Sequence, residues 1–183
     1  MELYDEKQLL VLLKEQKTVR RGFEILVRQY REKLYWQIRR IVLFHEDADD
    51  VLQNTFIKAW NSIESFHGDS KLFTWLSRIA INESLDFIRK KKVRQTISAD
   101  DESMGVANQL LADSFFDGDE TAAQLQEAIA ELPDVQRTVF QLRYFDEMKY
   151  SEISKITGTS EGGLKASYHI AVKKIEDFFH RHD

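Results

Sequence analysis

A loop and the helix predicted behind it, between Phe66 and Lys92, hold the side chains of this chain that are best suited to binding unpaired nucleic acid. The loop contains Gly68, Asp69 and Ser70, which are small or polar and leave room for a base. Aromatic residues follow, and then four consecutive cations that can contact phosphates: Arg89, Lys90, Lys91 and Lys92. This combination is typical of proteins that hold single-stranded DNA or RNA. A core helix whose basic end offsets the helix dipole is the alternative.

A helix-turn-helix is predicted between Tyr150 and Ile175. Ser151 suits the N-cap of the first helix, and Gly158 suits the left-handed residue that ends it. Thr159 or Ser160 can cap the second helix. A short helix, a tight turn and a longer helix form the motif that places its second helix in the major groove of DNA. A plain pair of antiparallel helices is the alternative.

The second helix of this motif has two different faces. One face is apolar, is expected to pack on Ile153 and Ile156, and consists of Leu164, Tyr168, Ala171, Ile175 and Phe178. The other face is polar or small and consists of Gly162, Lys165, Ala166, His169 and Lys173. Small residues allow close approach to DNA, and lysines can contact phosphates or guanine edges. The second face is therefore the candidate DNA-binding face.

Three carboxylates, Asp47, Asp49 and Asp50, lie where a helix is predicted to begin. They can complement the helix dipole, dock a basic partner, or form part of a metal or acid–base site. A di-iron bundle would need two Glu-x-x-His pairs, and only Glu64 and His67 have that spacing. The sequence contains no glycine-rich phosphate loop, and no Ser/His/Asp arrangement stands out. It therefore predicts no enzyme, no metal and no cofactor.

Helices must position all of these groups, because the apolar residues recur with a helical period. One stripe consists of Phe23, Leu26, Val27, Tyr30, Leu34, Ile38 and Ile41, a second of Val51, Leu52, Phe56, Ala59, Trp60 and Ile63, and a third of Phe73, Leu76, Ile79, Ala80 and Phe87. No stretch alternates as a strand does. The expected fold is all-α, with a compact bundle in the first half. Phe73 and Trp75 are expected to serve its core.

The distribution of charge divides the chain into three parts. The net charge is −5, but residues 94–120 contain seven acids and one base, whereas residues 1–93 contain 17 bases and 14 acids. We expect a helical domain at 1–93, an acidic flexible linker at 94–120 and a second helical domain at 121–183. The 183 residues include no cysteine and no apolar run long enough to span a membrane. A cytoplasmic protein without membrane insertion is expected.

Together these stretches resemble the extracytoplasmic-function (ECF, group 4) sigma factors of bacterial RNA polymerase, the smallest members of the sigma-70 family. The block from Asp47 to Trp60 resembles sigma region 2.2, and the block from Phe66 to Asn82 resembles regions 2.3 and 2.4. Leu132-Pro133, with Tyr150 to Ile175, resembles region 4. The resemblance implies a transcription initiation factor that binds core RNA polymerase, directs it to promoters and assists promoter opening without catalysing a reaction itself.

The resemblance also implies roles for individual residues. The surface that docks the β′ clamp helices would consist of Asp47, Asp50, Gln53 and Phe56. The minus-ten element would be held by a base-accepting loop, an asparagine and phosphate-binding cations: Phe66, His67, Gly68, Asp69, Ser70, Lys71, Arg78, Asn82, Arg89, Lys90, Lys91 and Lys92. The minus-thirty-five element would be contacted by Arg143, Ser160, Gly163, Lys165, Ala166, Ser167, His169 and Lys173. The expected partners are promoter DNA, the β′ clamp and β flap of core RNA polymerase, and an anti-sigma factor.

The recognition helix departs from the family pattern. Lys165-Ala166-Ser167 stands where Arg-Ser-Arg is common, Gly163 where threonine is common, and Ile170 where a basic residue is common. With fewer cations, the contact with the minus-thirty-five element is expected to be weaker or differently specific. The rival hypothesis is a helix-turn-helix regulator that acts without polymerase, as a symmetric dimer on palindromic sites. It leaves the stretch from Phe66 to Asn82 without a role.

Overall fold

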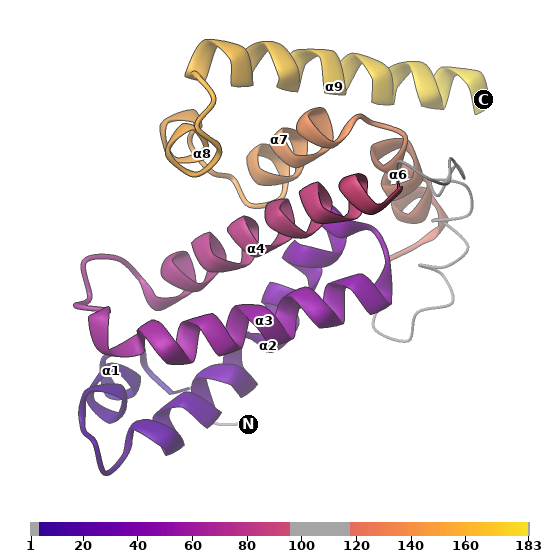
Figure 1. Cartoon of the computed structure of the whole chain (residues 1–183). Helices are drawn as coiled ribbons and strands as arrows, with labels where there is room; N and C mark the ends of the chain where they lie inside the picture. Colours follow the sequence, from indigo (N-terminus) through magenta and orange to yellow (C-terminus); the bar gives the residue numbers. More distant parts are fainter. Residues whose placement is uncertain (1–3, 96–117, 183) are drawn as a thin grey trace. The chain divides into compact units, whose positions relative to one another are not determined.

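Every regular element in the described part of the chain is a helix (Figure 1). The computed structural model describes residues 4–95 and 118–182. The chain divides into two compact units, Met1–Lys90 (unit 1) and Lys91–Asp183 (unit 2). The all-α fold expected from the sequence is therefore confirmed. Most of the predicted linker, residues 96–117, lies outside the described residues.

Unit 1 is a bundle that surrounds an aliphatic core. It contains α1 (Glu6–Lys14), α2 (Val19–Val42), α3 (His45–Ser62), the 3₁₀ turn η1 (Ile63–Ser65) and most of α4 (Leu72–Gln95). Helix α2 packs against both α1 and α3. The predicted apolar stripes supply the core, which includes Leu26, Leu34, Ile38, Val51, Leu52, Leu72 and Leu76. Phe73 and Trp75 pack against this core, as expected.

Helix α1 lies close to α2 and caps α4. A Cβ atom at Gly22 of α2 would lie 3.0 Å from Leu12 Cβ and 3.1 Å from Leu13 N, so glycine permits this close approach. Glu6 Oε1 accepts a hydrogen bond of 2.6 Å from Leu72 N. The first amides of a helix have no partner within it. Glu6, which precedes Leu72 by 66 residues, thus stabilises the start of α4, the helix that follows the loop of residues 66–70.

Unit 2 is organised around one long helix. It contains α6 (Glu120–Ala130), α7 (Asp134–Tyr144), α8 (Tyr150–Thr157) and α9 (Glu161–His182). Helix α9 packs against the other three. Asp119 Oδ1 accepts a hydrogen bond of 2.9 Å from Ala122 N and so caps α6. The main cluster of buried residues consists of Ala128, Ile129, Leu132, Phe140, Ala171, Ile175 and Phe178.

The predicted helix-turn-helix corresponds to α8 and α9. Gly158 ends α8 in the left-handed conformation, with φ +72°. Ser160 Oγ accepts a hydrogen bond of 3.2 Å from Gly163 N at the start of α9. The prediction of Ser151 as N-cap is wrong, because α8 already begins at Tyr150. Glu152 Oε2 accepts a hydrogen bond of 3.1 Å from Lys149 N, and this carboxylate fixes the earlier start.

Candidate nucleic-acid interface

The loop between η1 and α4 has a buried start and an exposed tip. Phe66 is only 9% exposed, and its ring lies 5.0 Å from that of Trp75, tilted by 37°. Phe66 therefore belongs to the core of unit 1. His67, Gly68 and Asp69 are exposed, and Gly68 has a φ of +87°, which favours glycine. The tip of the loop, formed by His67, Gly68 and Asp69, is thus the part that is open to a ligand. Ser70, which follows the tip, is half-buried.

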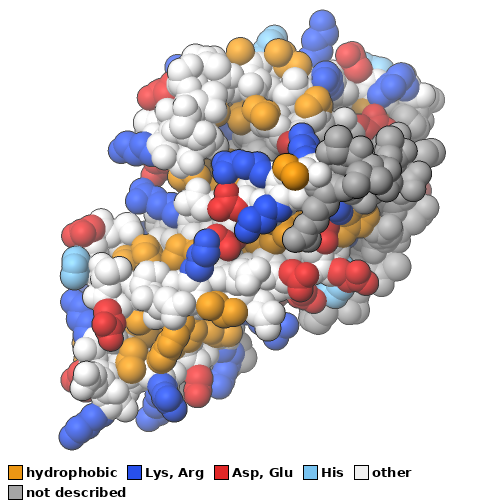
Figure 2. Space-filling view, in the orientation of Figure 1, with side chains coloured by type: hydrophobic (Ala, Val, Ile, Leu, Met, Phe, Trp, Pro, Cys, Tyr) orange, Lys and Arg blue, Asp and Glu red, His pale blue; other side chains and the backbone are white. Residues whose placement is uncertain are grey.

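Four polar side chains form an exposed stripe along α4. They are Lys71, just before the helix, and Arg78, Asn82 and Arg89 within it. Their spacings of 7, 4 and 7 residues place them on one helical face. Figure 2 shows Lys and Arg side chains along α4, with acidic side chains among them. The stripe begins at the loop and is suited to following a phosphate backbone.

Asn82 lies well along α4 from the loop that precedes this helix. It follows Leu72 by ten residues in one continuous helix, which corresponds to a rise of about 15 Å. Its side chain is exposed. We therefore expect Asn82 to contact a different nucleotide from the one held by the loop. Near the other end of the stripe, Arg89 pairs with Asp86 at 2.7 Å, and Lys90 and Lys92 are exposed while Lys91 is half-buried.

A hollow of about 560 Å³ lies between α2 and α3 in unit 1. Three of the residues predicted to dock a polymerase, Asp50, Gln53 and Phe56, line it, whereas Asp47 does not appear in its lining. Other residues in the lining are Phe23, Val27, Arg31, Asp49, Leu52, Ile57 and Trp60. Figure 2 shows apolar side chains gathered over α2 and α3. Acids beside an open apolar floor are suited to a protein partner rather than to DNA.

Ile57 and Trp60 also line this hollow, although neither was predicted from the sequence as a docking residue. Ile57 is 54% and Trp60 is 38% exposed, and the Trp60 ring packs edge-on against Phe23 with centroids 5.0 Å apart. Trp60 had been assigned to a core stripe. Their spacing could have identified them. Ile57 and Trp60 follow Gln53 by four and seven residues and therefore lie on the same helical face as Gln53.

The DNA-binding face predicted for the helix-turn-helix is exposed on α9. Gly162, Lys165, Ala166, His169 and Lys173 are all exposed, whereas Gly163 and Ser167 are half-buried. On the opposite face Leu164 and Ala171 are fully buried, and so is Ile153 of α8. The two faces of this helix are therefore arranged as the sequence predicted.

The ring of Tyr150 brings together two cations from different helices. The Arg143 guanidinium of α7 lies 5.3 Å and the Lys165 ammonium of α9 lies 5.8 Å from its centroid. Arg143 Nη1 also donates to Met148 O at 3.2 Å. Burial, followed by the neighbouring Tyr150, raises the pKa of the Tyr168 hydroxyl, and Arg143 only partly offsets this. The cluster thus presents two cations beside one aromatic ring, and such cations are suited to phosphate groups.

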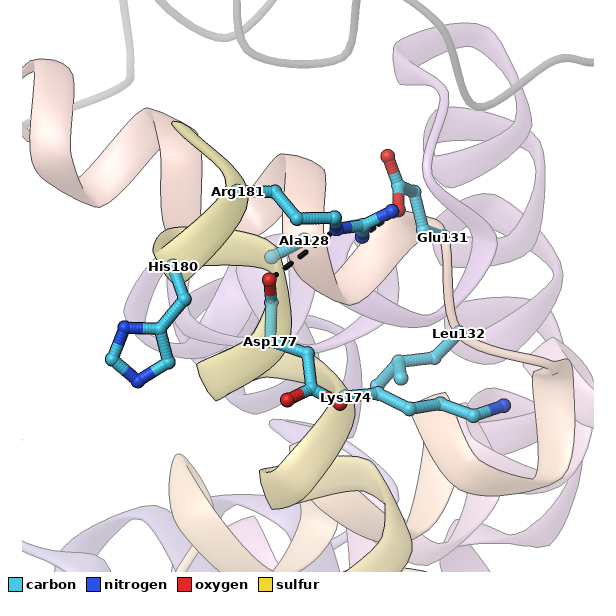
Figure 3. Close-up of a pocket in the computed structure, with 7 residues that line it drawn as sticks. All are labelled: Ala128, Glu131, Leu132, Lys174, Asp177, His180 and Arg181. Atoms are coloured by element: carbon cyan, nitrogen blue, oxygen red, sulfur yellow. Dashed lines mark hydrogen bonds and ion pairs between the residues drawn. The ribbon is translucent and has the colours of Figure 1, made fainter. Parts of the chain in front are cut away.

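A second hollow, of about 610 Å³, lies between α6 and the C-terminal half of α9 (Figure 3). Arg181 reaches across it to Glu131, with a distance of 3.5 Å between Nη2 and Oε2, while His180 points away from this pair. Lys174 and Asp177 also line it. The hollow is mixed in charge, and none of the exposed residues of the predicted DNA-binding face line it.

The described residues hold no group of three or more His, Asp or Glu side chains arranged for a metal ion. Among the same residues, no helix is both long and apolar enough to cross a membrane.

Comparison with known proteins places both units within described families. The family model for Sigma-70 region 2 matches residues 26–94, and that for Sigma-70, region 4 matches residues 122–175. The chain is 34% identical over 172 residues to the ECF RNA polymerase sigma factor SigW of Bacillus subtilis, covering 87% of this chain and 92% of that protein. It is 29% identical over 182 residues to the RNA polymerase sigma-H factor of Pseudomonas aeruginosa, covering 95% and 94%.

Solved structures share the fold at lower identity. The sigma factor RpoE of Bartonella quintana, crystallised with the anti-sigma factor NepR, has a TM-score of 0.65 at 20% identity, covering 87% of this chain and 98% of that chain. CnrH, solved in complex with the cytosolic domain of CnrY, has a TM-score of 0.65 at 21% identity, covering 97% and 99%. The helical architecture described above is therefore an established one.

Proposed function

Because this chain belongs to the extracytoplasmic-function sigma factors of the sigma-70 family, we propose that its two units share the recognition of one promoter while unit 1 also docks core RNA polymerase. As a sigma factor it is a transcription initiation factor that directs RNA polymerase to promoters. In this proposal residues 1–93 form the region 2 domain, 94–120 an acidic linker and 121–183 the region 4 domain. The chain acts by binding alone, in the bacterial cytoplasm.

One observation carries this proposal: a single unit bears two separate surfaces of different chemistry. The hollow between α2 and α3 is lined mainly by apolar side chains, with Arg31, Asp49 and Asp50 among them, and the stripe on α4 is polar and basic. A protein with both can hold polymerase and DNA at the same time. A helix-turn-helix regulator that acts without polymerase needs neither surface, so this rival is not favoured.

The proposal assigns the minus-ten element to the tip of the loop and the stripe on α4. An unpaired base would enter beside His67, Gly68 and Asp69, and the cations would hold the adjoining phosphates. Extruding a base costs a few kcal/mol of stacking, which these contacts must offset. Because the Phe66 ring is buried against Trp75, we propose that it holds the start of the loop in place and does not contact the base itself.

Asn82→Ala is expected to reduce open-complex formation about tenfold, since a good contact to a base contributes about 1–3 kcal/mol. Its exposure means that the fold should not change. Permanganate reactivity of unpaired thymines measures opening, and the affinity of the same variant for core polymerase is the control. Equal losses in both assays would indicate damage to unit 1 as a whole and would remove Asn82 from the DNA interface.

The minus-thirty-five element is assigned to the exposed face of α9, with the cations at Tyr150 placed to meet phosphates. Lys165→Ala is expected to lower the affinity of the holoenzyme for its promoter and to reduce the slope of log K against log salt by about 1. Lys14→Ala is the matched control, because Lys14 is an exposed lysine of α1 that lies in none of the proposed interfaces. An identical slope for both variants and the parent would remove Lys165 from the interface.

Two further partners, the β flap and an anti-sigma factor, are proposed from the position of the second hollow and from a solved relative. The hollow between α6 and α9 is lined by none of the exposed residues of the DNA-binding face, which makes it the candidate surface for the β flap. The RpoE structure contains an anti-sigma factor, and the same class of regulator is proposed for this chain.

Transcription from a genomic promoter library with core polymerase tests the proposal directly. Adding the chain should yield transcripts from a defined subset of promoters. Palindromic binding sites occupied by the chain without polymerase, together with no such transcripts, would support the rival regulator instead.

A further inference from the structure

Two parallel rows of side chains run along the exposed face of α9. Lys165, His169 and Lys173 form one row at four-residue spacing. Gly162, Ala166 and Ile170 form the other row at the same spacing. The first row carries cations and hydrogen-bonding groups, and the second has no polar side-chain atom.

Ile170 is the large apolar member of the second row. It is 44% exposed, although Leu164, Ala171 and Ile175 on the opposite face are buried. A single exposed isoleucine is common on soluble proteins. Here, however, Ile170 lies beside the row of Lys165, His169 and Lys173, on the face that the proposal assigns to the major groove. These neighbours are suited to phosphates and guanine edges, so we infer that Ile170 faces DNA.

The major groove offers one apolar group on its base edges, the 5-methyl group of thymine. Gly162 and Ala166 are small and let the helix approach, while the longer Ile170 side chain can reach a methyl group. Ile170 follows Ala166 by about 6 Å along the axis, which corresponds to about two base pairs at 3.4 Å each. The two residues would therefore face different steps of the DNA.

We propose that Ile170 is a specificity-determining residue that packs against the 5-methyl group of a thymine in the minus-thirty-five element. This inference rests on the proposed function, because it requires α9 to lie in the major groove. It gives the chain a preference for thymine at one position, where the cation common in the family would contact a phosphate or a guanine.

Deoxyuridine substitution tests the inference without changing the protein. Each thymine of the minus-thirty-five element, in a promoter selected by the library experiment, is replaced singly by deoxyuridine, which lacks only the methyl group. The holoenzyme is expected to lose about fourfold in affinity at one position, the effect of removing one buried methyl group. Other positions should change little.

The variant Ile170→Ala should bind the thymine promoter about as weakly as the parent binds the deoxyuridine promoter, and should no longer distinguish the two at that position. Val135→Ala, which removes another exposed apolar side chain from unit 2, should keep the parent's profile. A flat profile for the parent, or a profile that Ile170→Ala leaves unchanged, would overturn the inference while promoter binding stands. Loss of all promoter-specific binding would instead count against the proposed function.

Discussion

Ile57→Asp is expected to weaken the affinity of this chain for core RNA polymerase by 30-fold or more. Ile57 is 54% exposed and lines the hollow between α2 and α3 together with Phe56 and Trp60. Central apolar residues of an interface commonly contribute 2 kcal/mol or more, which is about 30-fold. A carboxylate at this position would also be buried on docking without a partner. Because Ile57 is exposed in the free chain, the fold of the Ile57→Asp variant should be unaffected.

Val11→Asp provides a matched control for this substitution. Val11 is 58% exposed on α1 and does not line the hollow, so the same chemical change is made on another helix of the same unit. Anisotropy of a labelled chain titrated with core polymerase gives both affinities, and thermal melting verifies both folds. If the two variants bound with the affinity of the parent, or if both lost it equally, the hollow would not be the docking surface.

Phe66→Ala is expected to lower the free energy of unfolding of unit 1 by about 3–5 kcal/mol, the usual cost of truncating a buried phenylalanine. The reason is the 9% exposure of Phe66 and its contact with Trp75. Urea titration followed by Trp fluorescence measures the change. A variant as stable as the parent would show that the ring is dispensable to the core.

Phe66→Leu separates the core role from direct contact with DNA. Leucine retains most of the apolar volume, so we expect a loss in stability of less than about 1.5 kcal/mol and near-normal promoter opening. If opening were lost in a stable Phe66→Leu protein, the aromatic ring itself would contact the base, and its position beneath the loop would change on binding DNA.

Periodicity predicted the helices well because the apolar stripe of each helix is buried against other helices of the same unit. The stripes with Leu26, Leu34 and Val51 are buried as expected. The same reasoning could not distinguish Trp60 from a core residue, since spacing reveals a shared face but not whether that face is covered. Ile57 was missed for a related reason, because it lay outside the core stripe and its significance depends on the hollow.

Contacts between distant residues were also beyond reach of the sequence. Phe66 adjoins polar loop residues and was grouped with them, although its ring packs on Trp75 nine residues later. Nothing local marks Gly22 as a point of close helix approach, because the atoms that require it belong to α1. The departure at Ile170 was visible in the sequence, but its exposure was not.

The hydrogen bond between Glu6 and Leu72 bears on the order in which unit 1 folds. It joins residues 66 positions apart, so it closes most of the unit into one large loop, and such contacts carry an entropy cost that delays them. During synthesis α1 emerges before α4, and the Glu6 carboxylate therefore has no Leu72 amide to accept from until α4 has followed. We therefore expect the start of α4, and with it the end of the adjoining loop, to be stabilised only after α1 and α4 have met.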